Sequence, residues 1–321
     1  MSMIQNALII SAGLYVGSLL TSYKEVEQSS SLLAYEQITA TNLEVTIEDD
    51  ELKDNSINLS QLQSNSSSID SRLITSSGSL QWKEKYITEN LTLNIPNDYM
   101  TIDLALSYLA DKVIMSNVIV TIKFSDGIYN FSESIDVSHP DGNRIHIIGN
   151  LVSPSSVVLN FSNTSGFSVI NRNKLGLIDG VTLNGDDSAS TYGIFASNNS
   201  LVKVGDNVVI RDFEKGISAV NSSFIGVGQS TVISNSIGIY TYRNSVIVFN
   251  GTSANNDIGV SAFRRSTITV NSASQVINNI SYGIRARDYS AIHAQATSVS
   301  GNGINYSPGK DSEGNNESYI R

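Results

Sequence analysis

The chain has no cysteine and only three histidines among its 321 residues. Without cysteine, disulfide frameworks and thiolate-ligated zinc sites are excluded. The histidines, His139, His146 and His293, lack the spacing of metal ligands, so we expect no metal and no cofactor. Charged residues make up only 16% of the chain, and its net charge is −10 at pH 7. That balance opposes nucleic-acid binding, which needs a basic face.

The chain also lacks a long apolar run. Its N-terminal segment ALIISAGLYVGSLL, residues 7–20, is too short to span a bilayer comfortably. No Lys or Arg precedes Lys24, whereas a secretory signal begins with a positive region. A cleaved signal and a membrane anchor stay open as alternatives. We interpret the run as a packing or docking segment and predict no membrane insertion.

A repeat dominates the second half of the chain. The segments GIFASNNS, GISAVNSS, GIYTYRNS, GVSAFRRS and GIRARDYS begin at Gly193, Gly216, Gly238, Gly259 and Gly283. The steps between these glycines are 23, 22, 21 and 24 residues, and a serine always follows seven residues after the glycine. Such a period is the signature of a stacked repeat fold.

Each repeat contains about three short strand-like pieces, which predicts one coil of a three-sided parallel β-helix. Coils stack about 4.8 Å apart, so equivalent residues form ladders. The aliphatic residue after each glycine is expected to point inward, the glycine to mark a corner that needs an unusual φ or no Cβ, and the serine to mark the next corner. The inward stack comprises Ile194, Ile217, Ile239, Val260 and Ile284.

Upstream of the repeats, the pattern predicts other elements. Heptad spacing of Leu52, Leu59 and Leu73, with Leu62 and Ile69 at the second core position, favours a short coiled coil over a polar linker. Apolar residues three to four apart predict an amphipathic helix over Asp98–Met115, which would cap the open end of the stack. We predict a docking segment (1–45), a stalk (46–94), a capped β-helix (95–307) and a polar C-terminal tail (308–321).

The helix TIDLALSYLADK, the stretch VTIKFSDGIYNFSESIDVSHPDGNRIHIIGN and the Gly–Ile–Ser coils resemble the pectate-lyase-like right-handed parallel β-helices of bacteriophage tailspikes and tail fibres. The resemblance covers about residues 95–305. It implies an all-β homotrimer on a virion tail, docked to other tail or baseplate proteins by its N-terminus and touching host surface polysaccharide. One feature departs from that pattern: the coils fade at GNGINYS (301–307) and a polar stretch follows, where such proteins usually carry a β-rich module.

Candidate site residues gather near one strand of each coil. Tyr240, Tyr242 and Phe263 suit stacking on sugar rings or packing against neighbouring subunits, and Arg285 and Arg287 are expected to share an outward face with Arg264 close by. We predict a carbohydrate-binding surface comprising Tyr240, Tyr242, Phe263, Arg264, Arg285 and Arg287. A plain solvated face is the alternative.

Glycan cleavage by this fold needs two carboxylates at a suitable separation. The acids in the coils form no ladder, so we interpret them as solvated turn residues: Asp186, Asp187, Asp206, Asp212, Glu214, Asp257 and Asp288. We therefore name no catalytic residue. The leading hypothesis is a non-enzymatic, trimeric tail fibre or tailspike component that contributes to host adsorption. A polysaccharide depolymerase and a secreted bacterial adhesin are the alternatives.

Overall fold

The computed structural model describes residues 73–76, 79–82, 85–294, 298–308 and 318–321. The chain divides into two units, Met1–Lys85 and Tyr86–Arg321. The predicted docking segment and most of the predicted coiled coil lie outside the described residues. In the first unit, β1 (Leu73–Ser76) pairs antiparallel with β2 (Ser79–Trp82). Leu73, the last position of the predicted heptads, therefore begins a strand.

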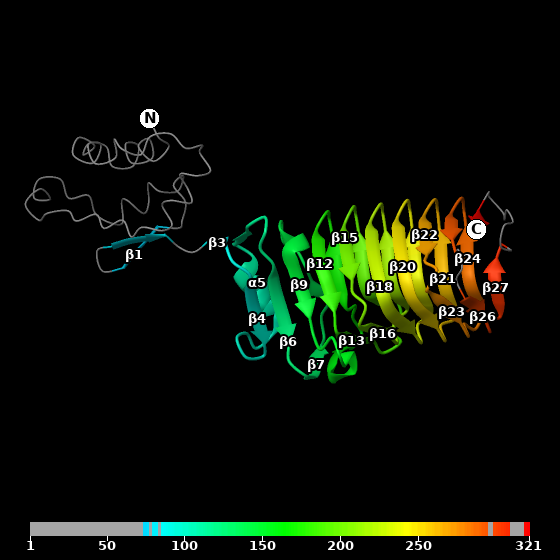
Figure 1. Ribbon diagram of the computed structural model, residues 1–321, viewed down its shortest axis with the longest axis horizontal. Coiled ribbons are helices and arrows are strands. Elements are labelled where there is room, and N and C mark those ends of the chain that lie inside the picture. The colour runs from blue at the N-terminus through cyan, green and yellow to red at the C-terminus, as the bar shows by residue number, and fades with distance from the viewer. Residues whose placement is uncertain (1–72, 77–78, 83–84, 295–297, 309–317) are drawn as a thin grey trace, which may run out of the picture. The chain divides into compact units, whose positions relative to one another are not determined.

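The second unit is a parallel β-solenoid of about nine turns, drawn as a row of arrows in Figure 1. A two-stranded parallel ladder, β3 (Tyr86–Ile87) with β5 (Val113–Ile114), accompanies its first turn. The other strands form three sides. The first side consists of β4 (Leu91–Ile95), β6 (Val120–Phe124), β9 (Ile145–Ile148), β12 (Lys174–Asp179), β15 (Leu201–Val204), β18 (Phe224–Ile233), β20 (Val246–Ala254), β22 (Thr267–Val270), β25 (Ala291–His293) and β28 (Tyr319–Ile320).

The second side is hydrogen-bonded to the first because β18 and β20 each run through a corner and pair on both sides. The second side consists of β7 (Gly127–Phe131), β10 (Val157–Phe161), β13 (Val181–Asn184), β16 (Val208–Arg211), the ends of β18 and β20, β23 (Gln275–Ile277) and β26 (Ser298–Ser300). The third side is a separate sheet: β8 (Ile135–Asp136), β11 (Phe167–Ile170), β14 (Tyr192–Ser197), β17 (Lys215–Val220), β19 (Ile237–Tyr242), β21 (Ile258–Phe263), β24 (Tyr282–Arg287) and β27 (Ile304–Ser307). Two short 3-10 helices lie between strands, η1 (Gly142–Arg144) and η2 (Pro154–Ser156).

The predicted inward stack is confirmed on the third side. Ile194 pairs in register with Ile217, which pairs with Ile239, and the ladder continues through Val260 to Ile284. All five side chains are completely buried. Each coil therefore supplies both the backbone partners and the apolar wall of the next, which is how a repeat too small to fold alone becomes stable.

Glycine recurs at this position of each coil because there is no room for a Cβ, and not because the backbone needs a left-handed conformation. None of the five repeat glycines has a positive φ. A Cβ on Gly216 would lie 2.5 Å from Val232 Cγ1 and 2.8 Å from the carbonyl oxygen of Gly238 in the next coil. Of the two reasons that the sequence suggested, the absence of a Cβ is the one that applies, because the chain turns tightly into the third side there.

The serine seven residues after each glycine forms a hydrogen-bonded ladder at the next corner. The backbone N–H of Ser223 donates to Ser245 Oγ at 3.2 Å, and that of Ser245 donates to Ser266 Oγ at 3.3 Å. The same bond joins Ser200 to Ser223, Ser266 to Ser290, and Ser290 to Ser318. A buried serine thus satisfies one backbone donor per coil, which explains its regular spacing.

A second internal ladder is built from asparagine. Asn256 accepts from the backbone N–H of Asn235 at 2.9 Å and from its Nδ2 at 3.1 Å, and its own Nδ2 donates to Asn279 Oδ1 at 3.0 Å. Asn279 bonds to Asn302 in the same way, at 2.8 Å. The neighbouring Asn255, by contrast, is exposed with φ 54°. In each Asn pair of this corner, one residue makes the turn and the other is buried.

The predicted helix is shorter in the structure. α5 spans Ile102–Leu109, and Thr101 Oγ1 accepts from the backbone N–H of Leu104 as its N-cap. Residues 113 and 114 form β5 instead, because these β-branched residues pair with β3. Ile102, Ala105 and Leu109 join the buried core of the solenoid, and α5 lies beside β4 at the N-terminal end of the stack (Figure 1).

The strands of the solenoid extend beyond both predicted limits of the β-helix, residues 95 and 307. β4 already pairs with β6 before residue 95. After residue 317 the chain returns to the stack, where β28 pairs with β25 and the backbone N–H of Ala294 donates to the Arg321 carbonyl at 2.6 Å. The predicted polar tail therefore ends in a strand of the first side.

Thr241 is the one polar side chain of the inward column that also holds Ala219 and Ala262. Its hydroxyl is buried without a hydrogen-bond partner. We expect Thr241→Val to raise the free energy of unfolding by about 1 kcal/mol, because it removes an unsatisfied polar group without changing the shape. Denaturant midpoints measure the effect, with Thr269→Val, at an outward position of β22, as the control. A destabilised Thr241→Val protein would show that the hydroxyl has a partner.

Candidate functional site

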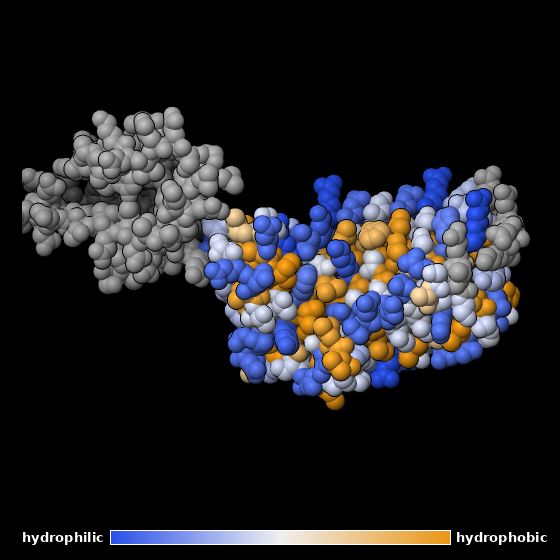
Figure 2. Space-filling model, viewed as in Figure 1, coloured by the Kyte–Doolittle hydropathy of each residue, from blue (hydrophilic) through white to orange (hydrophobic). Residues whose placement is uncertain are grey.

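The outward face of the third side carries most of the predicted site residues. Ile284 and Ala286 are buried in the core, so Arg285 and Arg287 point outward on the same face, as predicted. Tyr240 and Arg285 occupy one outward column with Ser261 between them, and Tyr242, Phe263 and Arg287 occupy the next. In the view of Figure 2, hydrophobic residues reach the solenoid surface along its length, among hydrophilic ones.

We call this surface the aromatic–basic face. It consists of Tyr192, Phe195, Lys215, Tyr240, Tyr242, Phe263, Arg264, Tyr282, Arg285 and Arg287, all on β14–β24 or in the corners that follow these strands. Tyr192, Lys215 and Tyr282 were not predicted from the sequence. Each immediately precedes a repeat glycine and is partly exposed.

The aromatic rings of this face stack on one another, within one strand for Tyr192–Phe195 and Tyr240–Tyr242 and between adjacent coils for Tyr242–Phe263. Tyr242 lies between Tyr240 and Phe263, with ring centroids 6.3 and 5.5 Å apart and interplanar angles of 15° and 13°. Tyr192 and Phe195 stack at 4.5 Å. The faces of these rings are therefore directed at neighbouring side chains.

Cations fill the remaining space around the rings. Arg264 Cζ lies 5.2 Å from the Tyr242 ring centroid and 5.5 Å from that of Phe263, and Arg264 Nη1 donates to the Tyr242 hydroxyl. Arg287 lies 5.7 Å from the Phe263 ring, and Arg285 lies 5.0 Å from the Tyr282 ring. These are cation–π distances, so the rings hold the guanidinium groups in defined positions.

Lys215 is held differently from the arginines. Its ammonium lies 5.2 Å from the Tyr192 ring and 5.6 Å from the Tyr240 ring, and it forms an ion pair with Glu214. Burial alone would raise the pKa of Glu214, but the hydrogen bonds from Lys215 and from the Ser190 backbone, with the Lys215 charge, lower it. Glu214 is therefore an ionised partner of Lys215.

Two buried polar atoms of this face have no hydrogen-bond partner among the described residues. They are Ser218 Oγ, beside Phe195 and Tyr240 in the ladder, and Arg285 Nε. Burial and the nearby Arg287 charge lower the pKa of Arg285. An unpaired buried donor on a charged group is costly.

Burial, followed by the neighbouring Tyr242 and Tyr192, raises the pKa of Tyr240 to about 12. A tyrosine whose proton is held more tightly in the folded chain makes stability fall as pH rises from its unfolded value near 10 towards 12. We expect Tyr240→Phe to reduce this alkaline loss. The free energies of unfolding at pH 9 and pH 11 test this, with Tyr289→Phe, which is exposed, as the control. Equal losses in Tyr240→Phe and the wild type would contradict it.

Two carboxylates of the coils lie on adjacent coils, because the backbone N–H of Asp187 donates to the Asp212 carbonyl at 2.8 Å. Burial, together with the Asp187 charge, raises the pKa of Asp212. Glu214 and Asp257 occupy equivalent corner positions, but they are two coils apart with Ser236 between them. Asp257 accepts from Ser281 Oγ, and Asp186 accepts from the backbone N–H groups of Asn163 and Ser188. These side chains bond to the turns around them, which agrees with their prediction as turn residues.

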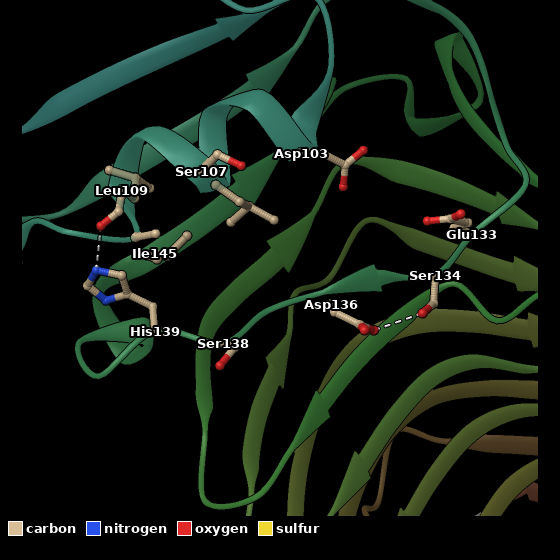
Figure 3. A pocket seen from close by; sticks show the side chains of 11 residues that line it. Asp103, Ser107, Leu109, Glu133, Ser134, Asp136, Ser138, His139 and Ile145 are labelled. Atoms are coloured by element: carbon tan, nitrogen blue, oxygen red, sulfur yellow. Dashed lines mark hydrogen bonds between the residues drawn. The ribbon is translucent and has the colours of Figure 1, made fainter.

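A cavity of 340 Å³ between α5 and β8 is a feature that the sequence analysis missed (Figure 3). Asp103 lies on the helix side, and Glu133 and Asp136 lie across from it, where Ser134 Oγ donates to Asp136 Oδ1 at 2.8 Å. All three carboxylates are exposed. Their spacing in the sequence gave no signal, because the cavity forms only when the helix folds over the first turns. Among the described residues, no group of His, Asp and Glu could hold a metal ion.

His139 at the edge of this cavity has a structural contact. Its Nδ1 accepts from the backbone N–H of Asp141 at 2.9 Å, so its Nε2 carries the proton and donates to the Leu109 carbonyl at 3.0 Å. Asp141 in turn bonds to Arg144 and to the backbone N–H of Ile114. The HPDGNR stretch (139–144) is thus a turn that ends in η1, and it secures the C-terminal end of α5.

No family model, no curated protein and no solved structure matches the chain. Within the part of the chain that the structure describes, no helix is both long enough and apolar enough to cross a membrane.

Proposed function

We propose that this chain is a structural component of a bacteriophage tail fibre or tailspike. In this proposal three copies associate, the solenoid is a right-handed β-helix that forms the shaft, and the N-terminal segment docks to other tail or baseplate proteins. The aromatic–basic face contributes to adsorption on the host surface. The chain would then be located on the virion.

The observation that carries the proposal is a stack of about nine coils with the aromatic–basic face on one side. A solenoid bonded from coil to coil is stiff along its axis, as a shaft requires, and its outward columns repeat a surface at each coil. The right-handed path is favoured because parallel crossover connections are nearly always right-handed. The resemblance of the helix and coils to tailspikes supports the trimer.

Light scattering after size exclusion, together with negative-stain electron microscopy, tests the fibre proposal. We expect a trimer with an elongated shaft. A stable monomer at micromolar concentration would contradict it. Electron microscopy of labelled phage particles would then locate the chain on the virion.

The acidic cavity beside α5 is the observation that favours a second candidate, a polysaccharide depolymerase. Glycan hydrolysis uses two carboxylates flanking the scissile bond, and Asp103, Glu133 and Asp136 line one cavity. Incubation with host capsule or lipopolysaccharide tests this: new reducing ends that disappear in Asp136→Asn would support it. The third alternative, a secreted adhesin, requires removal of an N-terminal signal, which mass spectrometry of the mature protein detects.

A further inference from the structure

We propose that the guanidinium groups of Arg264, Arg285 and Arg287 form a binding site for a polyanionic glycan, which they engage through its carboxylate or phosphate groups. The inference rests on the proposed function, because it names the ligand chemistry of the face assigned there to host adsorption. It differs from the sequence-based expectation in the role of the aromatic residues, which here position the arginines.

The charge of the coils changes sign locally. Residues 214–288 contain six cations, Lys215, Arg243, Arg264, Arg265, Arg285 and Arg287, and three carboxylates, Glu214, Asp257 and Asp288. The whole chain has a net charge of −10. All six cations lie on the third side or in the corners that follow its strands. A local excess of cations on one face of an acidic protein attracts anions to that face.

Several of these arginines occupy backbone positions that favour other residues. The corner after each third-side strand from β11 to β24 consists of two left-handed residues, which are Asn198 and Asn199 in one coil. Asparagine adopts that conformation readily. The same corner holds Arg264 and Arg265, with φ of 53° and 61°. Replacing either arginine by asparagine or glycine would relieve this backbone strain, and retained strain of this kind is typical of functional positions.

The rings leave the guanidinium groups available to an anion. Tyr242 and Phe263 stack on each other and on Arg264, so their faces are directed inside the cluster rather than towards a sugar. The ion pairs among described residues involve Lys112, Arg144, Arg211 and Lys215, and the charge of Asp257 acts on Arg285. A guanidinium held by ring stacking loses little entropy when it binds a carboxylate or phosphate.

Arg285 is partly exposed, and a ligand would meet the exposed part of its side chain, because its Nε is itself buried and has no hydrogen-bond partner among the described residues. Arg287 follows it by two residues on the same face, and Arg264 belongs to the preceding coil, about 4.8 Å away along the stack. Three cations spread over two coils suit a ligand with repeated negative charges.

Binding of purified polymers to the full-length protein tests the proposal. Isothermal titration at low salt would use polygalacturonate as the carboxylate probe, poly(glycerol phosphate) as the phosphate probe and dextran as the neutral one. We expect at least one polyanion to bind and dextran not to bind. Replacing Arg264, Arg285 and Arg287 together by Gln should weaken binding on the order of 100-fold, since hydrogen bonds to charged groups contribute strongly.

A matched variant separates a specific site from net charge. Lys123, Lys174 and Lys203 are exposed on the first side, and replacing all three by Gln changes the net charge by the same amount. We expect this variant to bind within about threefold of the wild type, because charges outside the site act only through the screened field. Equal weakening by the two triple variants would overturn the proposal.

Tyr242→Phe tests the positioning role without removing a cation. It keeps the ring stack but deletes the hydroxyl that accepts from Arg264, so we expect affinity to fall several-fold while the unfolding midpoint stays unchanged.

If neither polyanion binds the wild type, or dextran binds equally well, the proposal fails. Light scattering on the same samples keeps the two proposals apart: a trimer that binds no polyanion contradicts only this inference, and a monomer that binds contradicts only the fibre proposal. If the triple Arg variant alters the oligomeric state, the face is an interface between copies and the inference is wrong.

Discussion

Replacing Gly259 by alanine is expected to lower the free energy of unfolding by about 3 kcal/mol. The added Cβ would lie 2.7 Å from each of three atoms: Asn279 Nδ2, Val276 Cγ1 and the carbonyl oxygen of Gly283. The last of these is backbone of the next coil, so relief requires two hydrogen-bonded coils to separate. Because Gly259 has no positive φ, the cost arises from packing and not from backbone conformation. Chemical denaturation measures it.

Gly226→Ala is the matched control for this change. Gly226 also lies in a strand, but the nearest atom to its added Cβ is Phe224 Cε1 at 3.4 Å, an ordinary contact at the edge of a side chain. Alanine has less conformational freedom than glycine in the unfolded state, so we expect Gly226→Ala to be neutral or slightly stabilising. Similar losses in the two variants would show that glycine at the corner is not required by the close approach of the next coil.

Replacing Asn256 by alanine is expected to cost about 4 kcal/mol, from several buried hydrogen bonds that contribute together. The change removes the acceptor of the Asn235 backbone N–H and Nδ2, at 2.9 and 3.1 Å. It also removes the donor to Ser253 Oγ, at 3.1 Å, and to Asn279 Oδ1, at 3.0 Å. Water cannot replace these partners, because Asn256 is fully buried. Denaturation reports the total loss, and hydrogen exchange at the Asn235 amide reports the local one.

Asn255→Gly provides the comparison one residue away. Asn255 is exposed with φ 54°, a conformation that glycine adopts without strain, so the stability should change by a few tenths of a kcal/mol. If Asn255→Gly were as costly as Asn256→Ala, the turn rather than the ladder would account for the loss. If Asn256→Ala were neutral, the ladder would contribute nothing that the stacked backbone does not already supply.

The interior of the solenoid was predictable because one coil repeats. A residue recurring every 21 to 24 positions must meet its own equivalent when coils stack, so Ile217 and Ser223 could each be assigned an environment from their spacing. The α5 boundary was less predictable. An apolar spacing of three to four continues through Val113, but a strand partner, Tyr86–Ile87, competes for that residue, and a linear pattern does not contain the partner.

The aromatic–basic face was predictable in part. Tyr240, Tyr242, Phe263 and the arginines could be grouped because they share offsets from the repeat glycine. Their mutual stacking could not be inferred, since the direction of a side chain across a sheet depends on its neighbours in adjacent coils. The acidic cavity gave no sequence signal, because its residues come from a helix and a loop about 30 positions apart.

The amino-acid sequence by itself determined the coil length and the inward ladder, since these depend on period and residue type alone. Only the tertiary structure decided which side chains meet between coils. It paired Arg264 with Tyr242, left Arg285 Nε without an acceptor and returned Tyr319–Ile320 to the first side. The physical reason is that stacking brings residues far apart in the chain into contact on adjacent coils. Which outward side chains meet then depends on the corners of both coils, and the sequence of one coil does not specify this.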